Sequence, residues 1–139
     1  MIAIIPAVLP KSFDELKERL ARLCGVAPLV QIDLVGTNIL AGHDALPFGE
    51  AFDFECDLML GDPAAEVQTC IDIGASRVIV HAEDQNAHEA LLMLQQARAD
   101  TDFPIAVGVA LRAHDTAEVL DSFAGLYDFV QVMGIDHIG

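Results

Sequence analysis

Acidic and imidazole side chains recur in this sequence where short apolar segments end. Asp33, Asp57 and His81 each lie at or near the end of such a segment. Carboxylates and imidazoles are the groups with which proteins move protons and bind divalent cations. If the chain brings these residues together, they could carry out acid–base or metal-assisted chemistry.

The spacing of the polar residues strengthens this hypothesis. In a β-strand, residues two positions apart point to the same face. Three pairs have this spacing: Gln31 and Asp33, Glu55 and Asp57, and His81 and Glu83. Further polar residues follow two later apolar segments: Arg112, His114, Asp136 and His137. We expect Asp33, Asp57, His81 and Asp136 to meet at one rim.

Apolar segments alternate with amphipathic ones along the whole chain. The apolar segments predict six strands, at 2–9, 28–34, 51–60, 77–81, 104–111 and 127–133. The amphipathic segments predict helices at 12–24, 63–73, 86–99 and about 115–123. The first of these helices begins at Ser12, with Glu15 three residues later, as in a capping box. Residues 35–49 are predicted to be a loop, with a short helical turn near its end.

Repeated strand–helix units of this kind predict an α/β fold. The strands are short, apolar and often β-branched, which is typical of a parallel sheet. No GxGxxG follows the first strand, which argues against a dinucleotide-binding domain. We therefore expect an incomplete TIM-type (β/α) barrel, with six parallel strands and helices outside. Residues 1–139 would form a single domain that ends after the sixth strand.

Composition limits the partners. Acidic residues outnumber basic ones 22 to 7, for a net charge of −15, which disfavours nucleic acid and anionic lipid. No apolar run approaches the ~20 residues of a membrane span, and the N-terminus does not resemble a signal peptide. The three cysteines lack disulfide or CxxC spacing. We expect a cytoplasmic protein without nucleic-acid or membrane partners.

Several segments together resemble the ribulose-phosphate 3-epimerase family, of the ribulose-phosphate-binding barrel superfamily. They are IIPAVLPKSFDEL, VQIDLV, FDFECDLMLGDP, IDIGASRVIVHAE and IAVGVALRAHDTAEVL, in the family's order over nearly the whole chain. The resemblance implies a pentose-phosphate epimerase or isomerase, which moves a proton on the carbon beside a ketone with the help of a metal. It also implies a sugar-phosphate ligand and no organic cofactor.

The resemblance assigns roles to individual residues. Asp33 matches the family's catalytic aspartate, which also binds the metal. Gln31 and Asp57 stand where the family has metal-binding histidines, so Asp33, Asp57 and Gln31 are the expected ligands. Oxygen ligands favour Mg²⁺ or Mn²⁺ over Zn²⁺. Met59, His81 and Asp136 are expected to contact the substrate.

The sequence also departs from the family pattern. The family's strand-seven aspartate has no counterpart, and its glycine-rich phosphate turn is replaced by GIDHIG. We therefore expect weak or absent epimerase activity in this form. One alternative is a non-catalytic barrel that acts through oligomerisation. Another is a distant relative of orotidine-phosphate decarboxylase and hexulose-phosphate synthase, whose DxKxxD motif is matched by DLMLGD except at Met59.

The expected strand count also predicts self-association. A barrel of this class closes with eight strands, so six would leave two unpaired edges. The high share of apolar residues, 53%, points the same way. We expect a homodimer or a higher homo-oligomer.

Overall fold

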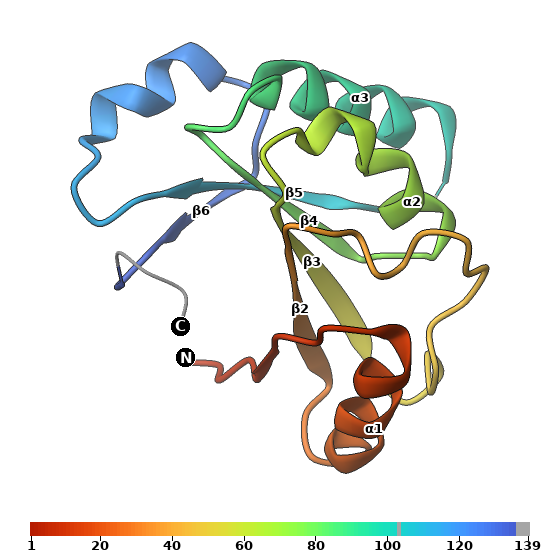
Figure 1. The fold of residues 1–139 in the computed structure, drawn as a ribbon. Coiled ribbons are helices and arrows are strands. Elements are labelled where there is room, and N and C mark those ends of the chain that lie inside the picture. Colours follow the sequence, from red (N-terminus) through yellow and green to blue (C-terminus); the bar gives the residue numbers. More distant parts are fainter. Residues whose placement is uncertain (103, 136–139) are drawn as a thin grey trace.

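The computed structural model describes residues 1–102 and 104–135. Six parallel strands form one sheet and follow one another in sequence order from β1 to β6. They are β1 (Ala7–Val8), β2 (Leu29–Val35), β3 (Asp53–Met59), β4 (Arg77–His81), β5 (Ala106–Leu111) and β6 (Phe129–Val132). The sheet is curved, and the helices lie along its outer side (Figure 1). The predicted incomplete barrel is confirmed.

The helical segments are α1 (Phe13–Leu23), the 3-10 helix η1 (Pro63–Ala65), α2 (Val67–Asp72), α3 (Ala87–Asp100) and the 3-10 helix η2 (Ala117–Phe123). At the start of α1, the Ser12 side chain accepts a hydrogen bond from the Glu15 backbone N–H at 3.1 Å. The Glu15 carboxylate in turn accepts one from the Lys11 backbone N–H at 2.8 Å. The predicted helix start is therefore correct.

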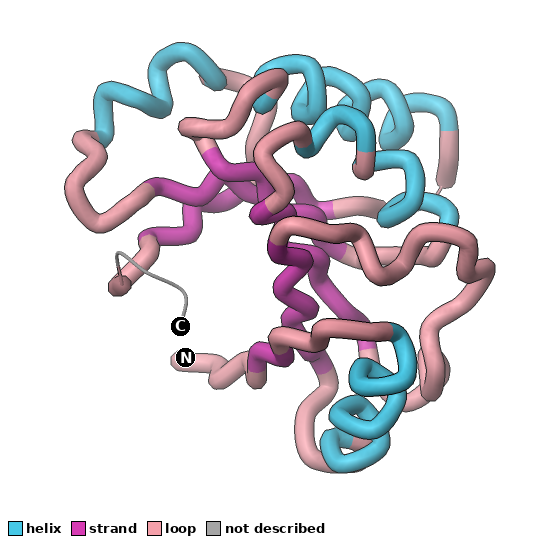
Figure 2. Tube along the Cα trace, in the orientation of Figure 1, coloured by secondary structure: helices cyan, strands magenta, loops and turns pink. Residues whose placement is uncertain are grey.

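Two segments differ from the prediction. Strand β1 has two residues instead of eight, because Pro6 has no N–H to donate to a longer ladder and Ile2 and Ile4 are exposed. The connection between β2 and β3, residues 36–52, contains no helix (Figure 2). Near its end, where a short helical turn was predicted, the Gly49 N–H donates to the Leu46 carbonyl and the Ala51 N–H to the Phe48 carbonyl, so the chain makes turns there.

The two faces of the sheet differ in chemistry. On the outer face, strand residues pack against helices in one apolar core, which includes Ile32, Cys56, Val80, Leu20 and Leu91. Strand residues of the opposite parity face the inside of the curve. This inner face is mixed: it carries Asp57 and His81 as well as the apolar residues Ile79, Ala110 and Phe129.

The lower part of the inner face is a small packed layer. Arg77 lies 3.5 Å from the Glu55 carboxylate, and its guanidinium carbon lies 5.6 Å from the centre of the Phe129 ring. Gly108 pairs with Phe129 across β5 and β6, and its missing side chain leaves room for that ring. Along their strands, Glu55, Arg77 and Phe129 lie nearer the amino-terminal end than Asp57, His81 and Gln131.

Candidate functional site

Strand register places the two aspartates of the site side by side. Asp33 on β2 is directly opposite Asp57 on β3, and Gln31 is opposite Glu55. The amide nitrogen Nε2 of Gln31 donates to Asp33 Oδ1 at 2.7 Å and to Asp57 Oδ2 at 3.3 Å. A single amide group therefore bridges the two carboxylates.

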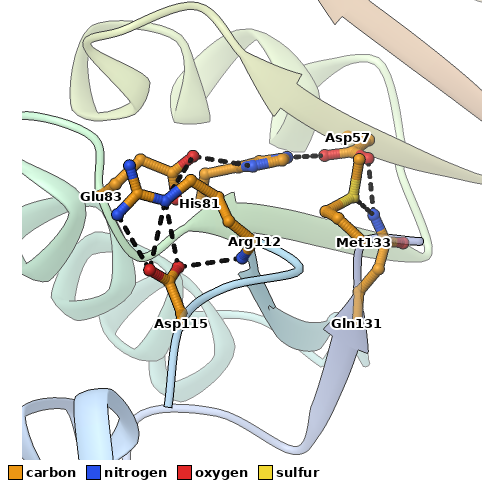
Figure 3. Close-up of polar contacts among 7 residues, drawn as sticks. All are labelled: Asp57, His81, Glu83, Arg112, Asp115, Gln131 and Met133. Carbon is orange, nitrogen blue, oxygen red and sulfur yellow. Dashed lines mark hydrogen bonds and ion pairs between the residues drawn. The ribbon is translucent and has the colours of Figure 1, made fainter. Parts of the chain in front are cut away.

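Asp57 is the centre of the site, with only 1% of its surface exposed. Besides Gln31, its Oδ2 accepts a hydrogen bond from Gln131 Nε2 on β6 at 2.8 Å. Its Oδ1 lies 2.8 Å from His81 Nε2 at the end of β4 (Figure 3). Three side chains from three strands thus hold one buried carboxylate in place.

His81 connects this network to a group of charged residues. Its second ring nitrogen, Nδ1, lies 3.7 Å from Glu83 Oε1. Arg112 Nε lies 3.9 Å from the same oxygen, and Arg112 Nη2 forms an ion pair with Asp115 at 2.9 Å. The chain of contacts runs from Asp57 through His81 to Arg112 (Figure 3).

The environment shifts the proton affinity of several of these groups. Burial raises the pKa of Asp33; the Gln31 hydrogen bond lowers it in part, and the nearby Asp57 charge raises it again. Burial alone would lower the pKa of His81, but its hydrogen bond to Asp57 and the charges of Asp57 and Glu83 raise it overall. Perturbed groups of this kind gather at functional sites.

A cavity of about 220 Å³ lies beside this network. Its walls include Met59, His81, Glu83, Asp84, Arg112 and Met133. It is at the carboxyl ends of the strands, where barrel proteins place their functional sites. A second cavity, of about 470 Å³, lies at the amino-terminal end, near Ile4, Leu29 and Arg77. The first cavity is the better candidate, because the polar network borders it.

The predicted site residues fall into three groups. Met59 and His81 border the cavity, as the substrate-contact prediction requires. The second group, Asp33, Gln31 and Asp57, is joined in the hydrogen-bonded network. Asp136 lies outside the described residues. The predicted meeting of Asp33, Asp57 and His81 is therefore observed, while their roles stay predictions.

Gln131 was missed by sequence reasoning. The segment FVQVM contains one polar residue in an otherwise apolar strand, and that was the available signal. Its contact with Asp57 spans 74 residues in sequence and joins strands that are not neighbours. Only the curvature of the sheet brings the two together.

The predicted metal ligands are close together, but their donor atoms are poorly arranged for an ion. The Gln31 amide nitrogen carries protons and cannot bind a cation, yet it is the atom between the two carboxylates. Across residues 1–102 and 104–135, no three His, Cys, Asp or Glu side chains are grouped to hold a metal. This arrangement does not fit the implied ion, and the metal site stays a prediction for binding measurements to decide.

The fold and the site together define a (β/α)-barrel protein whose polar site lies at the carboxyl ends of its strands. The sequence model of the ribulose-phosphate 3 epimerase family matches residues 3–137. The chain therefore belongs to that family. No curated protein matches the chain significantly. No helix in the described part of the chain is long and apolar enough to cross a membrane.

Proposed function

We propose that this protein binds a ribulose phosphate or a similar sugar phosphate and catalyses slow proton transfer at the carbon beside its ketone. The observation that carries the proposal is the hydrogen-bonded network that joins Asp33 and Asp57 to His81, a residue of the cavity wall, in a chain of this family. Proton transfer next to a carbonyl needs a base within reach of that carbon.

Asp33 is the proposed base. It matches the family's catalytic aspartate, and its burial raises its pKa towards the range where a carboxylate accepts protons well. The Gln31 hydrogen bond fixes the position of its Oδ1 atom. Met59 and His81 line the cavity and would contact the substrate.

Two features support a low rate. Gln31 and Asp57 replace residues that hold a metal in the family, and here they contact each other instead. Without those ligands, the stabilisation of charge that develops on the substrate oxygen would depend more on hydrogen-bond donors. The cation at the cavity, Arg112, is already paired with Asp115 and close to Glu83, which weakens its pull on a phosphate.

A coupled assay with ribulose 5-phosphate tests the proposal. We expect a small signal at high protein concentration, and loss of that signal in Asp33→Asn. The matched control is Asp53→Asn, which removes a carboxylate of β3 at the opposite end of the sheet. Equal turnover by Asp33→Asn and wild type would rule out Asp33 as the base.

A non-catalytic barrel is the second candidate. It is favoured by the bonds of Gln31 to Asp33 and Asp57, which occupy both carboxylates within the protein. A folded protein that shows no turnover and no proton exchange with the sugar phosphate would support this alternative over the enzyme.

A further inference from the structure

We propose that Gln131 is a positioning residue of this site, which acts on the proposed base through Asp57 and Gln31. This inference rests on the proposed function, in which Asp33 is the base. Strands β2 and β6 are not neighbours in the sheet, yet an amide from each donates to Asp57 Oδ2. Gln131 holds Asp57 from across the barrel, which leaves the Gln31 amide to the base.

The bond lengths show how the two amides are shared between the two carboxylates. Gln31 Nε2 lies 2.7 Å from Asp33 Oδ1 but 3.3 Å from Asp57 Oδ2. Gln131 Nε2 lies 2.8 Å from the same Asp57 oxygen. Since N–H···O bonds are typically about 2.9 Å long, each carboxylate receives one short bond, and the two short bonds come from different glutamines.

Asp57 needs the second amide because it is buried. Only 1% of its surface is exposed, so water is poorly placed to replace a lost donor, and a buried oxygen without a donor is costly. Without Gln131, the donor that the described residues still offer to Oδ2 is Gln31. The Gln31 amide would then move towards Asp57, and its bond to Asp33 would lengthen.

A second contact fixes the orientation of the Gln131 amide. Its Nε2 atom lies 3.3 Å from Met133 Sδ, and Met133 is part of the cavity wall (Figure 3). An amide nitrogen has two N–H groups, so one can point to the carboxylate and the other to the sulfur. If the amide were turned round, its carbonyl oxygen would face the Asp57 oxygen, and two acceptors repel each other. The donor is therefore directed at Asp57 before any ligand arrives.

The amide at this position serves Asp57 rather than packing. Gln131 shares the inner face of β6 with the apolar residue Phe129, two positions earlier. An apolar side chain in its place could pack beside that ring, but it would leave Asp57 Oδ2 with the long bond from Gln31. The packing of the strand does not require a glutamine here, whereas the arrangement of the two carboxylates does.

Proton–nitrogen NMR of the glutamine side-chain amides tests the arrangement in Gln131→Leu, which has a side chain of similar size but no donor. The Gln31 proton bonded to Asp33 should move upfield as that bond lengthens, and the proton directed at Asp57 should move downfield. The matched control is Gln96→Leu, which removes an exposed bond from Gln96 to the Asp100 carboxylate on α3. In this control the Gln31 signals should stay at their wild-type positions.

Hydrogen exchange of ribulose 5-phosphate in heavy water tests the effect on the reaction. Proton NMR follows the loss of the signal of the hydrogen beside the ketone. Because a misplacement of about 1 Å can cost ~100-fold in rate, Gln131→Leu should lower kcat for this exchange by ~10-fold to ~100-fold. KM should change little, since Gln131 is not among the described residues that line the cavity. Gln96→Leu should exchange at the wild-type rate.

The two measurements separate this inference from the proposed function. Unchanged Gln31 amide signals in Gln131→Leu, or a wild-type exchange rate, would overturn the role of Gln131 while the proposed function stands. No exchange with wild type would overturn both. If Gln131→Leu does not fold, the Gln131 amide of wild type decides. A proton far downfield of the exposed glutamine amides supports the inference, and a position like that of Gln96 overturns it.

Discussion

His81 Nε2 lies 2.8 Å from Asp57 Oδ1, and both side chains are almost completely buried. Because the net effect of this contact is a raised pKa for His81, the folded protein holds the imidazole proton more tightly than the unfolded chain does. The resulting stability is fully present below the unfolded pKa of ~6.5 and is lost as pH rises through the folded pKa.

Stability should therefore fall as pH rises above about 6.5, and His81→Gln should flatten that fall. Burial also raises the pKa values of Asp33, Glu55 and Asp84. Their deprotonation therefore also lowers the stability of the folded protein as pH rises, but at lower pH than His81. Urea unfolding at several pH values measures the slope, with His88→Gln as control. A His81→Gln curve parallel to that of wild type would contradict the prediction.

Much of this site could be predicted from strand periodicity. Residues two apart share a face, so Gln31 and Asp33 could be placed together before the structure was known, and His81 and Glu83 likewise. Periodicity gives the face of a strand but not its partner across the barrel. The bond of Gln131 to Asp57 and the packing of Arg77 on Phe129 depend on sheet curvature, which no local pattern encodes.

The fold could also be predicted from local sequence patterns, and the errors of that prediction are local too. The apolar segments predicted the strands, and the amphipathic segments between them predicted the helices that cover the outer face of each strand. The same rule overestimated β1, where Ile2 and Ile4 are apolar but exposed. Apolar character predicts a strand only where a neighbouring strand can pair with it.

Gly108→Ala should destabilise the lower layer of the inner face. A Cβ atom at this position would lie 2.6 Å from two ring carbons of Phe129. Overpacking of this kind costs about 1–3 kcal/mol of unfolding free energy. Adding Phe129→Leu should recover part of that loss. Gly134→Ala is the control, because no atom of residues 1–102 or 104–135 lies within 4 Å of its added methyl group. Equal urea midpoints for Gly108→Ala and Gly134→Ala would show that the ring moves aside freely.

We propose that the protein self-associates through the sheet edges. Strands β1 and β6 are the outer strands of the sheet, and Ile2, Ile4 and Val132 are exposed near them. Unpaired strand edges tend to pair with another chain. Light scattering at micromolar concentration should give at least the mass of a dimer, and Val132→Lys should shift the protein towards monomer. A monomer mass for wild type would contradict this proposal.

Whether the site binds a metal can be tested with wild type and with a variant that lacks the bridging amide of Gln31. Because its nitrogen lies between Asp33 and Asp57, we expect no detectable binding when Mn²⁺ or Zn²⁺ is titrated into wild type by calorimetry. Gln31→His together with Asp57→His would remove that bridge and place two imidazoles beside Asp33. Imidazole nitrogens are good ligands for Zn²⁺, so this double variant should gain binding.

In that double variant, Asp33 would be the carboxylate ligand beside the two imidazoles. Adding Asp33→Asn should therefore abolish the gained Zn²⁺ binding. Gln131 is left unchanged throughout, so a difference between the variants reports on β2 and β3 alone. Binding of Mn²⁺ by wild type would contradict the expectation. It would mean that Gln31 turns its amide oxygen towards the ion, because only a cation could stabilise that oxygen between two carboxylates.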